Sequence, residues 1–280
     1  MKILVTGANG YIGQGVVRAL LDLNQEVIAT DFDIAHIDSR AKSVAADIFA
    51  IDSPFEYFDK PDALLHLAWR DGFKHDSLNH LGDLYNHYIF LSNMITAGIK
   101  QVAVLGSMHE VGFHEGSIDE KTPANPLSLY GISKNSLRQS VELLKRQNDF
   151  TYQWIRGFYI VGNVDYGCSI FSKIAQAAKS GQKTFPFTSG ENQFDFIDYD
   201  EFCYQVASVV TQTSVTGIIN CCSGKPMKLS ERVEQFIKDN NFDIKLLYGE
   251  FPDRPYDSKA IWGNNSKIQK ILKEQSNERI

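Results

Sequence analysis

The sequence predicts an α/β fold in which helices cover both faces of a doubly wound parallel sheet. In its first half, short apolar runs of strand length alternate with longer segments whose apolar residues recur every three or four positions. The strand-like runs are continuously apolar rather than alternating, which is typical of strands buried on both faces. The repeated strand–helix–strand order predicts βαβ units and therefore a parallel sheet.

The strands and helices of the first half follow one another in regular order. The run KILVTG at 2–7 ends in glycine, as a buried strand leading into a turn should. The helix expected at 13–24 places Val16, Leu20 and Leu23 on one face. By the same criteria, further strands are expected at 26–31, 63–69 and 101–107, and a strand leading into a loop at 151–162. Further helices are expected at 78–97 and 128–147.

The second half is less regular and contains no low-complexity linker. We interpret it as a smaller lobe interleaved with the end of the first domain. The large domain is expected to cover 1–165 and to regain 195–222, and the substrate-binding lobe is expected to comprise 166–194 and 223–280. Its elements are expected to be a helix at 169–180, a strand and then a helix within 190–210, a strand at 217–224, and helices at 230–240 and from Ser266 onward.

Charge and composition exclude several classes of protein. The net charge of -6 and the lack of a long basic run argue against nucleic acid as the main partner, because phosphate binding needs clustered Lys and Arg. No apolar stretch approaches the roughly 20 residues of a membrane-spanning helix. The chain also begins with a strand-like run instead of a signal peptide, so we expect a cytoplasmic protein with no membrane partner. The four cysteines lack metal-ligand spacing and are expected to be reduced thiols, and no metal site is predicted.

The segment TGANGYIG joins the first strand to the first helix. Its glycines, Gly7, Gly10 and Gly13, allow a tight turn and let backbone N–H groups approach a pyrophosphate at the helix N-terminus. At the end of the second strand, Asp31 can accept hydrogen bonds from ribose hydroxyls and would repel a 2′-phosphate, although a turn-capping role is the alternative. Asp47 can reach the adenine amine or lie in a solvated loop. The pattern predicts a Rossmann-like domain that binds NAD rather than NADP.

Three further residues carry the predicted chemistry. Tyr130 and Lys134 are four residues apart in the helix expected at 128–147 and so lie on one face. An ammonium beside a phenol favours the phenolate and is expected to lower the tyrosine pKa from ~10 toward neutral pH. Such a tyrosine can exchange a proton with a sugar oxygen while a nicotinamide carries hydride. Ser107 ends the strand before this helix and is either part of the same site or a capping residue of a turn.

Taken together, these motifs resemble the extended short-chain dehydrogenase/reductase superfamily, in the branch called the NAD-dependent epimerase/dehydratase family. The resemblance covers nearly the whole chain. Besides the glycine turn, Asp31 and the Tyr–Lys pair, it includes the segments LHLAW, GSMHEVG, QFDFIDYDEF and RPYDSKAIWGNNSK.

The resemblance implies a role for each predicted site residue. Ser107 is expected to hydrogen-bond the reacting oxygen, Tyr130 to be the acid/base, and Lys134 to bind the nicotinamide ribose and tune the tyrosine. NAD contacts are implied for Gly7, Gly10, Tyr11, Ile12, Gly13, Asp31, Asp47, Ile48, Leu67, Ala68, Tyr130 and Lys134.

The residues after Ser107 bear on the type of reaction. Dehydratases of this family resemble Thr-Asp-Glu where this chain has Ser107, Met108 and His109, and Met108 has no proton to give, which disfavours dehydration. In fucose-synthase-like relatives, a cysteine two residues after the serine serves in epimerisation, and His109 falls at that offset. His109 can exchange protons near neutral pH, or it can orient the substrate. Glu110 and His114 are expected to be solvated loop residues.

The resemblance also places a nucleotide diphosphate in the smaller lobe, often held by two arginines. Arg254 in RPYD matches one of them, whereas Phe194 stands where the other is usual. Tyr159 also replaces a usual asparagine. Because the loss of a bidentate arginine matters for phosphate recognition, the sugar and the base stay open. Substrate contacts are expected from Ser107, Met108, Tyr159 and Arg254.

We therefore expect an NAD-dependent oxidoreductase acting at C4 of a nucleotide-activated sugar, in the form of a 4-keto-6-deoxyhexose reductase. The alternative is a nucleotide-sugar 4-epimerase that uses the same residues and retains its NAD. A non-catalytic NAD-binding regulator of the same fold is a third hypothesis, but such proteins tend to lack the tyrosine or the lysine, and both are present here. Relatives often dimerise through the helix that carries the Tyr–Lys pair and its neighbour, so a homodimer is expected.

Overall fold

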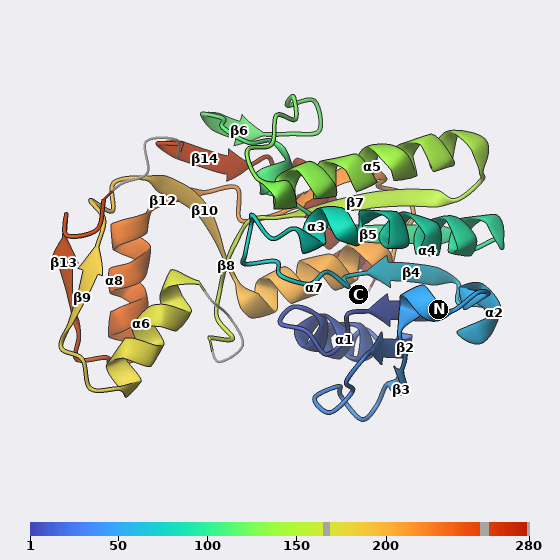
Figure 1. Cartoon of the computed structure of the whole chain (residues 1–280), viewed down its shortest axis with the longest axis horizontal. Coiled ribbons are helices and arrows are strands. Elements are labelled where there is room, and N and C mark those ends of the chain that lie inside the picture. Colours follow the sequence, from blue (N-terminus) through green and yellow to red (C-terminus); the bar gives the residue numbers. More distant parts are fainter. Residues whose placement is uncertain (165–168, 253–257, 279–280) are drawn as a thin grey trace.

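A seven-stranded parallel sheet forms the centre of the molecule (Figure 1). The computed structural model describes residues 1–164, 169–252 and 258–278. In the strand order β11-β7-β5-β4-β1-β2-β3, the chain first winds outward from β1 through β2 to β3, and then returns to β4 and winds outward the other way. This switch point between β1 and β4 confirms the predicted doubly wound sheet. The strands are β1 (Lys2–Thr6), β2 (Glu26–Asp31), β3 (Lys42–Ala45), β4 (Ala63–His66), β5 (Gln101–Ser107), β7 (Thr151–Gly157) and β11 (Gly217–Cys221).

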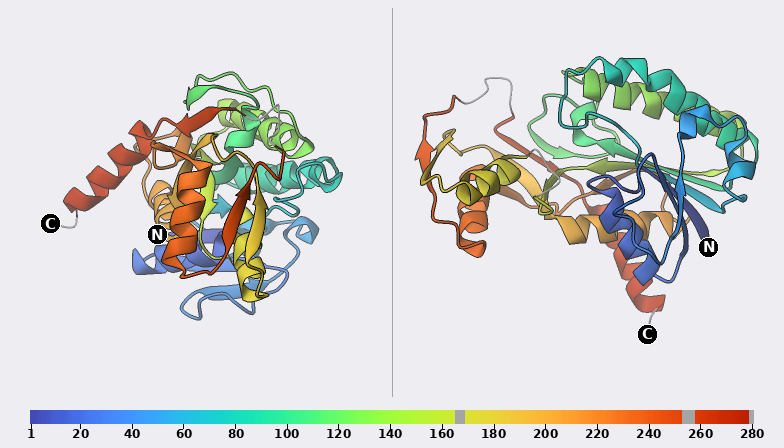
Figure 2. Two further views of the ribbon diagram at one scale, coloured as in Figure 1. Left: turned by 90° about the vertical axis from the view of Figure 1, so that its left-hand side faces the viewer. Right: turned by 60° about the horizontal axis from the view of Figure 1, so that its bottom comes forward.

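Helices cover both faces of this sheet, as Figure 2 shows. Along β1, Ile3 and Val5 are buried against one layer of helices and Leu4 against the other, because successive side chains of a strand point to opposite faces. One layer contains α1 (Gly13–Asp22), α7 (Tyr199–Val210) and α9 (Ser266–Glu278). The other contains α2 (Pro54–Tyr57), α4 (Leu84–Thr96) and α5 (Leu129–Gln147).

Two predicted elements are divided in the structure. The helix expected at 78–97 becomes α3 (Asn79–Gly82) and α4, which meet at Asp83, and the Arg70 guanidinium binds the Asp83 carboxylate. The strand expected at 151–162 becomes β7 and β8 (Tyr159–Val161), because β8 leaves the large sheet and pairs with a strand of the smaller lobe. Both breaks depend on tertiary contacts that a periodic pattern does not contain.

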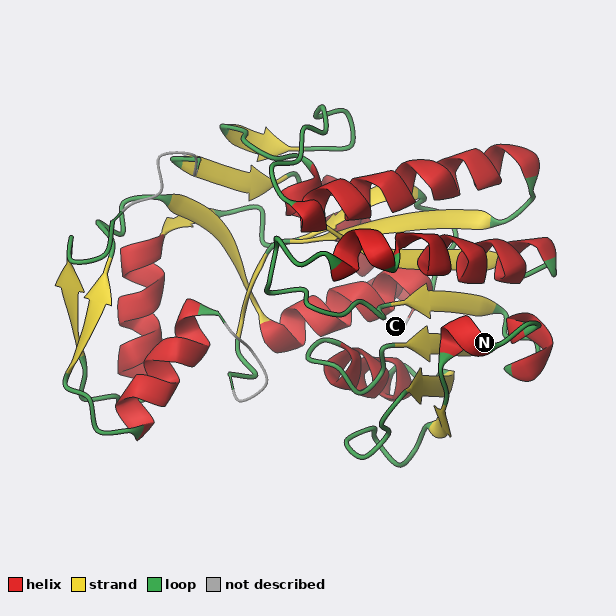
Figure 3. Ribbon diagram, in the orientation of Figure 1, coloured by secondary structure: helices red, strands yellow, loops and turns green. Residues whose placement is uncertain are grey.

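The smaller lobe lies at one end of the large sheet and has its own sheet and helices (Figure 3). Phe171, Phe194, Phe196 and Phe236 belong to its buried core. The predicted strand and helices of this region are present as β10 (Gln193–Asp198), α6 (Ile170–Lys179) and α8 (Leu229–Asp239). Five short strands outside the large sheet were not expected: β6 (Gly116–Ile118), β9 (Thr184–Phe187), β12 (Pro226–Lys228), β13 (Lys245–Tyr248) and β14 (Ala260–Gly263). The edge strand β3 of the large sheet was not expected either.

The large domain and the lobe exchange more segments than expected. Helix α9 lies within the range expected for the lobe, yet Ile268 and Ile271 are buried in the core between the large sheet and α7. Strand β6 comes from the first half of the chain and pairs with β14 in the lobe. None of the described helices is long and apolar enough to cross a membrane.

The described cysteines, Cys203, Cys221 and Cys222, are free and buried, as expected for reduced thiols. Burial raises the pKa of the Cys203 thiol to about 12, so this thiol stays protonated and unreactive at neutral pH. Cys168 lies outside the described residues.

Candidate active site

The predicted site residues gather at one edge of the sheet. Since parallel strands all end at the same edge, the structure places there the turn after β1, Asp31 at the end of β2 and Ser107 at the end of β5. The first turns of α5 bring Tyr130 and Lys134 to the same edge. The smaller lobe lies at this end of the sheet (Figure 1).

The glycine turn is too tightly packed for side chains. Gly7 has φ +70°, and a Cβ added to it would lie 2.6 Å from the backbone nitrogen of Ala68. A Cβ on Gly13 would lie 2.1 Å from the carbonyl oxygen of Gly7. The helix N-cap, Ile12, offers no side-chain hydrogen bond to the first turn of α1. The turn therefore leaves backbone N–H groups at a helix N-terminus for a pyrophosphate.

The carboxylate of Asp31 is held beside this turn. Its oxygens accept hydrogen bonds from the backbone N–H groups of Asn9, at 3.0 Å, and Phe32, at 2.8 Å. The Asn9 side-chain oxygen in turn accepts a bond from the backbone of His36 at 2.9 Å. Asn9 thus ties the glycine turn to the loop after β2. Sequence reasoning passed over it, although an asparagine inside a glycine turn is a recognisable signal.

The other expected NAD contacts lie around the same turn. Asp47 is exposed and caps a short 3₁₀ turn that begins at the buried Ile48. On the other side, the backbone of Leu67 donates to the Thr6 carbonyl at 3.1 Å, and the backbone of Ala68 to the Thr6 hydroxyl at 3.4 Å. A turn with no room for side chains at Gly7 and Gly13, flanked by the carboxylate of Asp31, fits NAD and would repel a 2′-phosphate.

Ser107 and Tyr130 meet although they lie in different elements. Ser107 is nearly buried, and its hydroxyl accepts a hydrogen bond from the His109 backbone at 3.2 Å. Burial raises the pKa of Tyr130 to about 12, while a hydrogen bond between the Tyr130 and Ser107 side chains acts in the opposite direction. Tyr130 therefore keeps its proton at neutral pH.

Lys134 does not act on Tyr130 as the sequence led us to expect. Its ammonium donates a hydrogen bond to the Leu105 carbonyl at 2.7 Å and lies 3.9 Å from the centroid of the Trp69 ring, but 6.0 Å from that of Tyr130. Burial lowers the pKa of Lys134 itself to about 7. The expected fall in the Tyr130 pKa is therefore wrong for this structure, because burial of the phenol outweighs a lysine charge directed elsewhere.

A second expectation is wrong for this structure, because Glu110 is fully buried rather than solvated. Its carboxylate accepts hydrogen bonds from the Ser107 backbone at 2.7 Å, the Trp154 indole at 2.8 Å and the Arg156 guanidinium at 3.3 Å. Burial raises the pKa of Glu110, and the charge of Arg156 opposes that rise. The pattern Ser-x-x-Glu is the sequence signature of a capping box, and it could have identified this residue. His114 is half-buried rather than fully solvated, and its ring bonds to the Ser117 carbonyl at 3.2 Å.

A group of rings that sequence reasoning did not single out surrounds Tyr130. The His75 ring stacks on it at 5.2 Å between centroids, and His80 and Trp69 approach it at 5.3 and 6.2 Å. The His109 ring lies 4.5 Å from His75. Burial lowers the pKa of His109 to about 3, so His109 is neutral at physiological pH. The only sequence signal was a stretch rich in histidine after β4.

The expected substrate contacts lie partly on the lobe side of the site. Met108 is buried in the core of the smaller lobe. Tyr159 is half-buried, and its ring packs on that of Phe194 at 4.4 Å. Phe194 itself is buried in β10. Arg254 lies outside the described residues.

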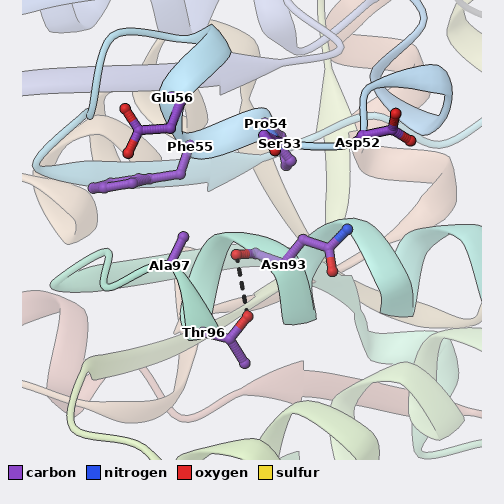
Figure 4. A pocket seen from close by; sticks show the side chains of 8 residues that line it. All are labelled: Asp52, Ser53, Pro54, Phe55, Glu56, Asn93, Thr96 and Ala97. Atoms are coloured by element: carbon purple, nitrogen blue, oxygen red, sulfur yellow. Dashed lines mark hydrogen bonds between the residues drawn. The ribbon is translucent and has the colours of Figure 1, made fainter.

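A surface pocket of about 270 Å³ lies between α2 and α4 (Figure 4). Phe55, Asn93 and Thr96 are among the residues that line it. None of the predicted site residues does so, and we assign it no role in the reaction. In the described part of the chain, no group of three or more His, Cys, Asp or Glu side chains is placed to hold a metal ion.

Comparisons with known proteins agree with this geometry. Residues 3–222 match the NAD dependent epimerase/dehydratase family. The chain is 42% identical over 269 residues to a dTDP-6-deoxy-L-talose 4-dehydrogenase (NAD(+)) from Aggregatibacter actinomycetemcomitans, covering 94% of this chain and 99% of that protein.

Two solved structures show the same fold at low sequence identity. A UDP-N-acetylglucosamine 4-epimerase from Methanobrevibacter ruminantium superposes with a TM-score of 0.81 at 22% identity, covering 96% of this chain and 91% of the other. A UDP-glucuronic acid 4-epimerase from Bacillus cereus, in complex with UDP-glucuronic acid and NAD, has a TM-score of 0.81 at 20% identity, covering 98% and 93%.

Proposed function

Because the chain belongs to the NAD-dependent epimerase/dehydratase family, we propose that it is an oxidoreductase acting at C4 of a nucleotide-activated 6-deoxyhexose. In the reducing direction, a 4-keto group becomes a 4-hydroxyl group. The dehydrogenase relative, which matches this chain over almost its whole length, supports assigning the reaction to C4 of a 6-deoxyhexose. The protein is an NAD-dependent enzyme, so a purely regulatory role is set aside.

The contact between Ser107 and Tyr130 is the observation that carries the proposal. Since the Tyr130 pKa is about 12, the phenol is protonated at neutral pH and can donate a proton to the C4 oxygen when the ketone is reduced. NAD supplies or accepts the hydride when it is bound, so that ketone, NADH and a proton become alcohol and NAD⁺. Ser107 would hold the reacting oxygen. Lys134, close to the end of β5, would bind the nicotinamide ribose.

We propose further that the smaller lobe, without helix α9, binds the nucleotide part of the substrate. Tyr159, Met108 and Arg254 are its proposed contacts. Of the two roles open to His109, orientation of the substrate is favoured over proton exchange, because a base with a pKa of about 3 accepts protons poorly.

The test is a spectrophotometric assay with purified protein, NADH and a nucleotide-linked 4-keto-6-deoxyhexose. We expect NADH to be consumed, as followed by the loss of its absorbance, in an amount equal to the alcohol formed. Tyr130→Phe should reduce kcat by about 100- to 10,000-fold, because it removes the proton donor. Tyr57→Phe, at an exposed tyrosine on α2, is the matched control and should leave kcat unchanged. Equal turnover by Tyr130→Phe would refute the mechanism.

The same assay separates the reductase from a 4-epimerase. An epimerase would keep NAD through purification and interconvert UDP-sugars without added cofactor. The solved epimerases share the fold with this chain, so the fold alone does not distinguish the two. No oxidation of NADH by several keto-sugars, together with such interconversion, would replace the reductase by the epimerase.

We also propose a cytoplasmic homodimer that pairs through α4 and α5. Both helices expose apolar side chains, including Tyr85 on α4 and Ile132 and Leu143 on α5. The cytoplasm supplies NAD(H), and the free, buried state of the described cysteines agrees with a reducing compartment. Sedimentation velocity would test the dimer, and a monomer at micromolar concentration would exclude it.

A further inference from the structure

We propose that His75 is a positioning residue that holds Tyr130 in its reactive orientation, from within a strap formed by residues 70–80. The strap follows β4 and runs between the glycine turn and helix α5. The proposal rests on the function proposed above, since it takes Tyr130 as the proton donor.

Three contacts join His75 to the site. Its backbone carbonyl accepts the N–H of Tyr130 at 2.9 Å. Tyr130 lies in the first turn of α5, where an N–H has no carbonyl partner within the helix, so this bond comes from outside the helix. The His75 ring also lies nearly parallel to the Tyr130 ring, at 5.2 Å and 11°. The third contact is with the His109 ring, whose centroid lies 4.5 Å from that of His75 at an angle of 63° between the rings.

The strap that carries His75 is fixed along its length. The Asp71 carboxylate accepts hydrogen bonds from the Ser77 hydroxyl and the Asn79 amide, each at 2.7 Å. The ring of Phe73 contacts that of Tyr11 in the glycine turn, at 5.9 Å. These contacts keep the strap folded and attach it to the NAD-binding end of the site.

His80 anchors the other end of the strap. Its ring accepts a hydrogen bond from the Trp69 indole at 3.0 Å and, through the other nitrogen, bonds to the Lys74 carbonyl at 2.9 Å. The rings of His80 and Trp69 meet Tyr130 at angles of 60° and 78°, and neither stacks on it. His75 is therefore the ring in this group that both stacks on the phenol and bonds to its backbone.

The expected effect is on turnover rather than on cofactor binding. A displacement of about 1 Å in a reacting group can cost about 100-fold in rate. His75→Ala removes the stacked ring but keeps the backbone carbonyl, so we expect kcat to fall about 10- to 100-fold with little change in the KM for NADH. His75→Phe restores a flat ring and should recover most of the lost kcat. His114→Ala, at a half-buried histidine whose ring bonds to the Ser117 carbonyl and not to a site residue, is the matched control and should behave as wild type.

A second readout does not need turnover. In protein labelled with 3-fluorotyrosine, the Tyr130 fluorine resonance is identified by its absence in Tyr130→Phe. Loss of the stacked ring in His75→Ala should shift this resonance, His75→Phe should shift it less, and His114→Ala should not shift it. If His75→Ala does not fold, His75→Gln takes its place, because it also lacks a ring.

The outcomes separate the two proposals. An unshifted resonance with unchanged kcat in His75→Ala would overturn the positioning role. If His75→Phe were as slow as His75→Ala, ring stacking would be refuted. If the wild type reduced no keto-sugar, the proposed function would fail, and the fluorine resonance alone would still decide whether His75 positions Tyr130.

Discussion

Lys134 illustrates at the scale of a residue how burial changes what a side chain does. It is almost fully buried, and its pKa is lowered to about 7. In the unfolded chain, a lysine keeps its proton up to about pH 10.4. Between these values the unfolded state binds one proton more than the folded state, so stability rises with pH through this window. Below pH 7 both states are protonated, and the cost of burying the charge is present in full.

This difference predicts the behaviour of Lys134→Met. The unfolding free energy of Lys134→Met minus that of the wild type should fall by about 1–3 kcal/mol between pH 7 and pH 9. The wild type gains stability over that range because of its lysine, and the variant lacks this gain. Urea unfolding of the cofactor-free proteins at both pH values measures this change. Lys270→Met, at an exposed lysine of α9, is the matched control. A difference that does not vary with pH would show that Lys134 is not buried as described.

Asp31 gives a prediction about cofactor choice. Its carboxylate is held beside the glycine turn by backbone bonds from Asn9 and Phe32. Asp31→Ser removes the charge that would repel a 2′-phosphate, so the ratio of kcat/KM for NADH over NADPH should fall about 10- to 100-fold. Initial rates with both cofactors measure the ratio. Asp33→Ser, at a neighbouring exposed acid, should leave it unchanged, and equal effects of the two variants would contradict the role of Asp31.

At the scale of an element, β5 depends on a glycine just before its reactive end. A Cβ on Gly106 would lie 2.1 Å from the Trp154 indole nitrogen and 2.3 Å from a carboxylate oxygen of Glu110. Both of these groups lie in the buried cluster that holds the backbone of Ser107. The end of β5 therefore has no room for a methyl group.

We expect Gly106→Ala to lower the free energy of unfolding by about 1–3 kcal/mol, because an added methyl group overpacks this cluster. It should also lower kcat, since Ser107 must move with Glu110. Chemical denaturation and the reductase assay test the two effects. Gly82→Ala, where a Cβ would meet nothing within 4 Å, should be neutral in both. A stable and active Gly106→Ala enzyme would contradict this account of the strand.

Elements differed in how well the sequence predicted them. Helices α1, α5 and α8 and strands β1 and β5 are long enough to show a periodic or continuous apolar pattern. Strands such as β6 and β12 have three residues each, too few for any period to be recognised. They exist because the lobe supplies neighbouring strands to pair with, and that pairing joins segments far apart in the chain.

At the scale of the whole molecule, buried imidazoles connect the large sheet to its helices. The His66 ring bonds to the Thr6 hydroxyl of β1 at 2.8 Å and to His87 of α4 at 2.9 Å. Burial lowers the pKa of His66 to about 3 and also lowers that of His87. Together with His109, these rings are neutral in the folded protein at pH values where the unfolded chain protonates them.

The fold should therefore lose stability in mild acid. Because the folded-state pKa values lie below the unfolded value near 6.5, stability is complete above pH 6.5 and declines as the pH falls toward 3. Each imidazole should contribute a loss of about 2 kcal/mol by pH 5. Urea unfolding between pH 7 and pH 5 measures the loss, and a His109→Gln variant should show a shallower dependence. A flat profile for the wild type would contradict the burial of these rings.

By itself, the sequence determined the sheet-and-helix architecture, the glycine turn with Asp31, and the presence of Ser107, Tyr130 and Lys134. These features are local, because they depend on spacing within one or two elements. Only the tertiary structure decided the electrostatics of the site. The desolvation of Tyr130, the burial of Lys134, the carboxylate of Glu110 beneath Ser107 and the His75 strap all arise where separate elements pack together. Desolvation depends on everything that surrounds a group, and no local pattern of residues records it.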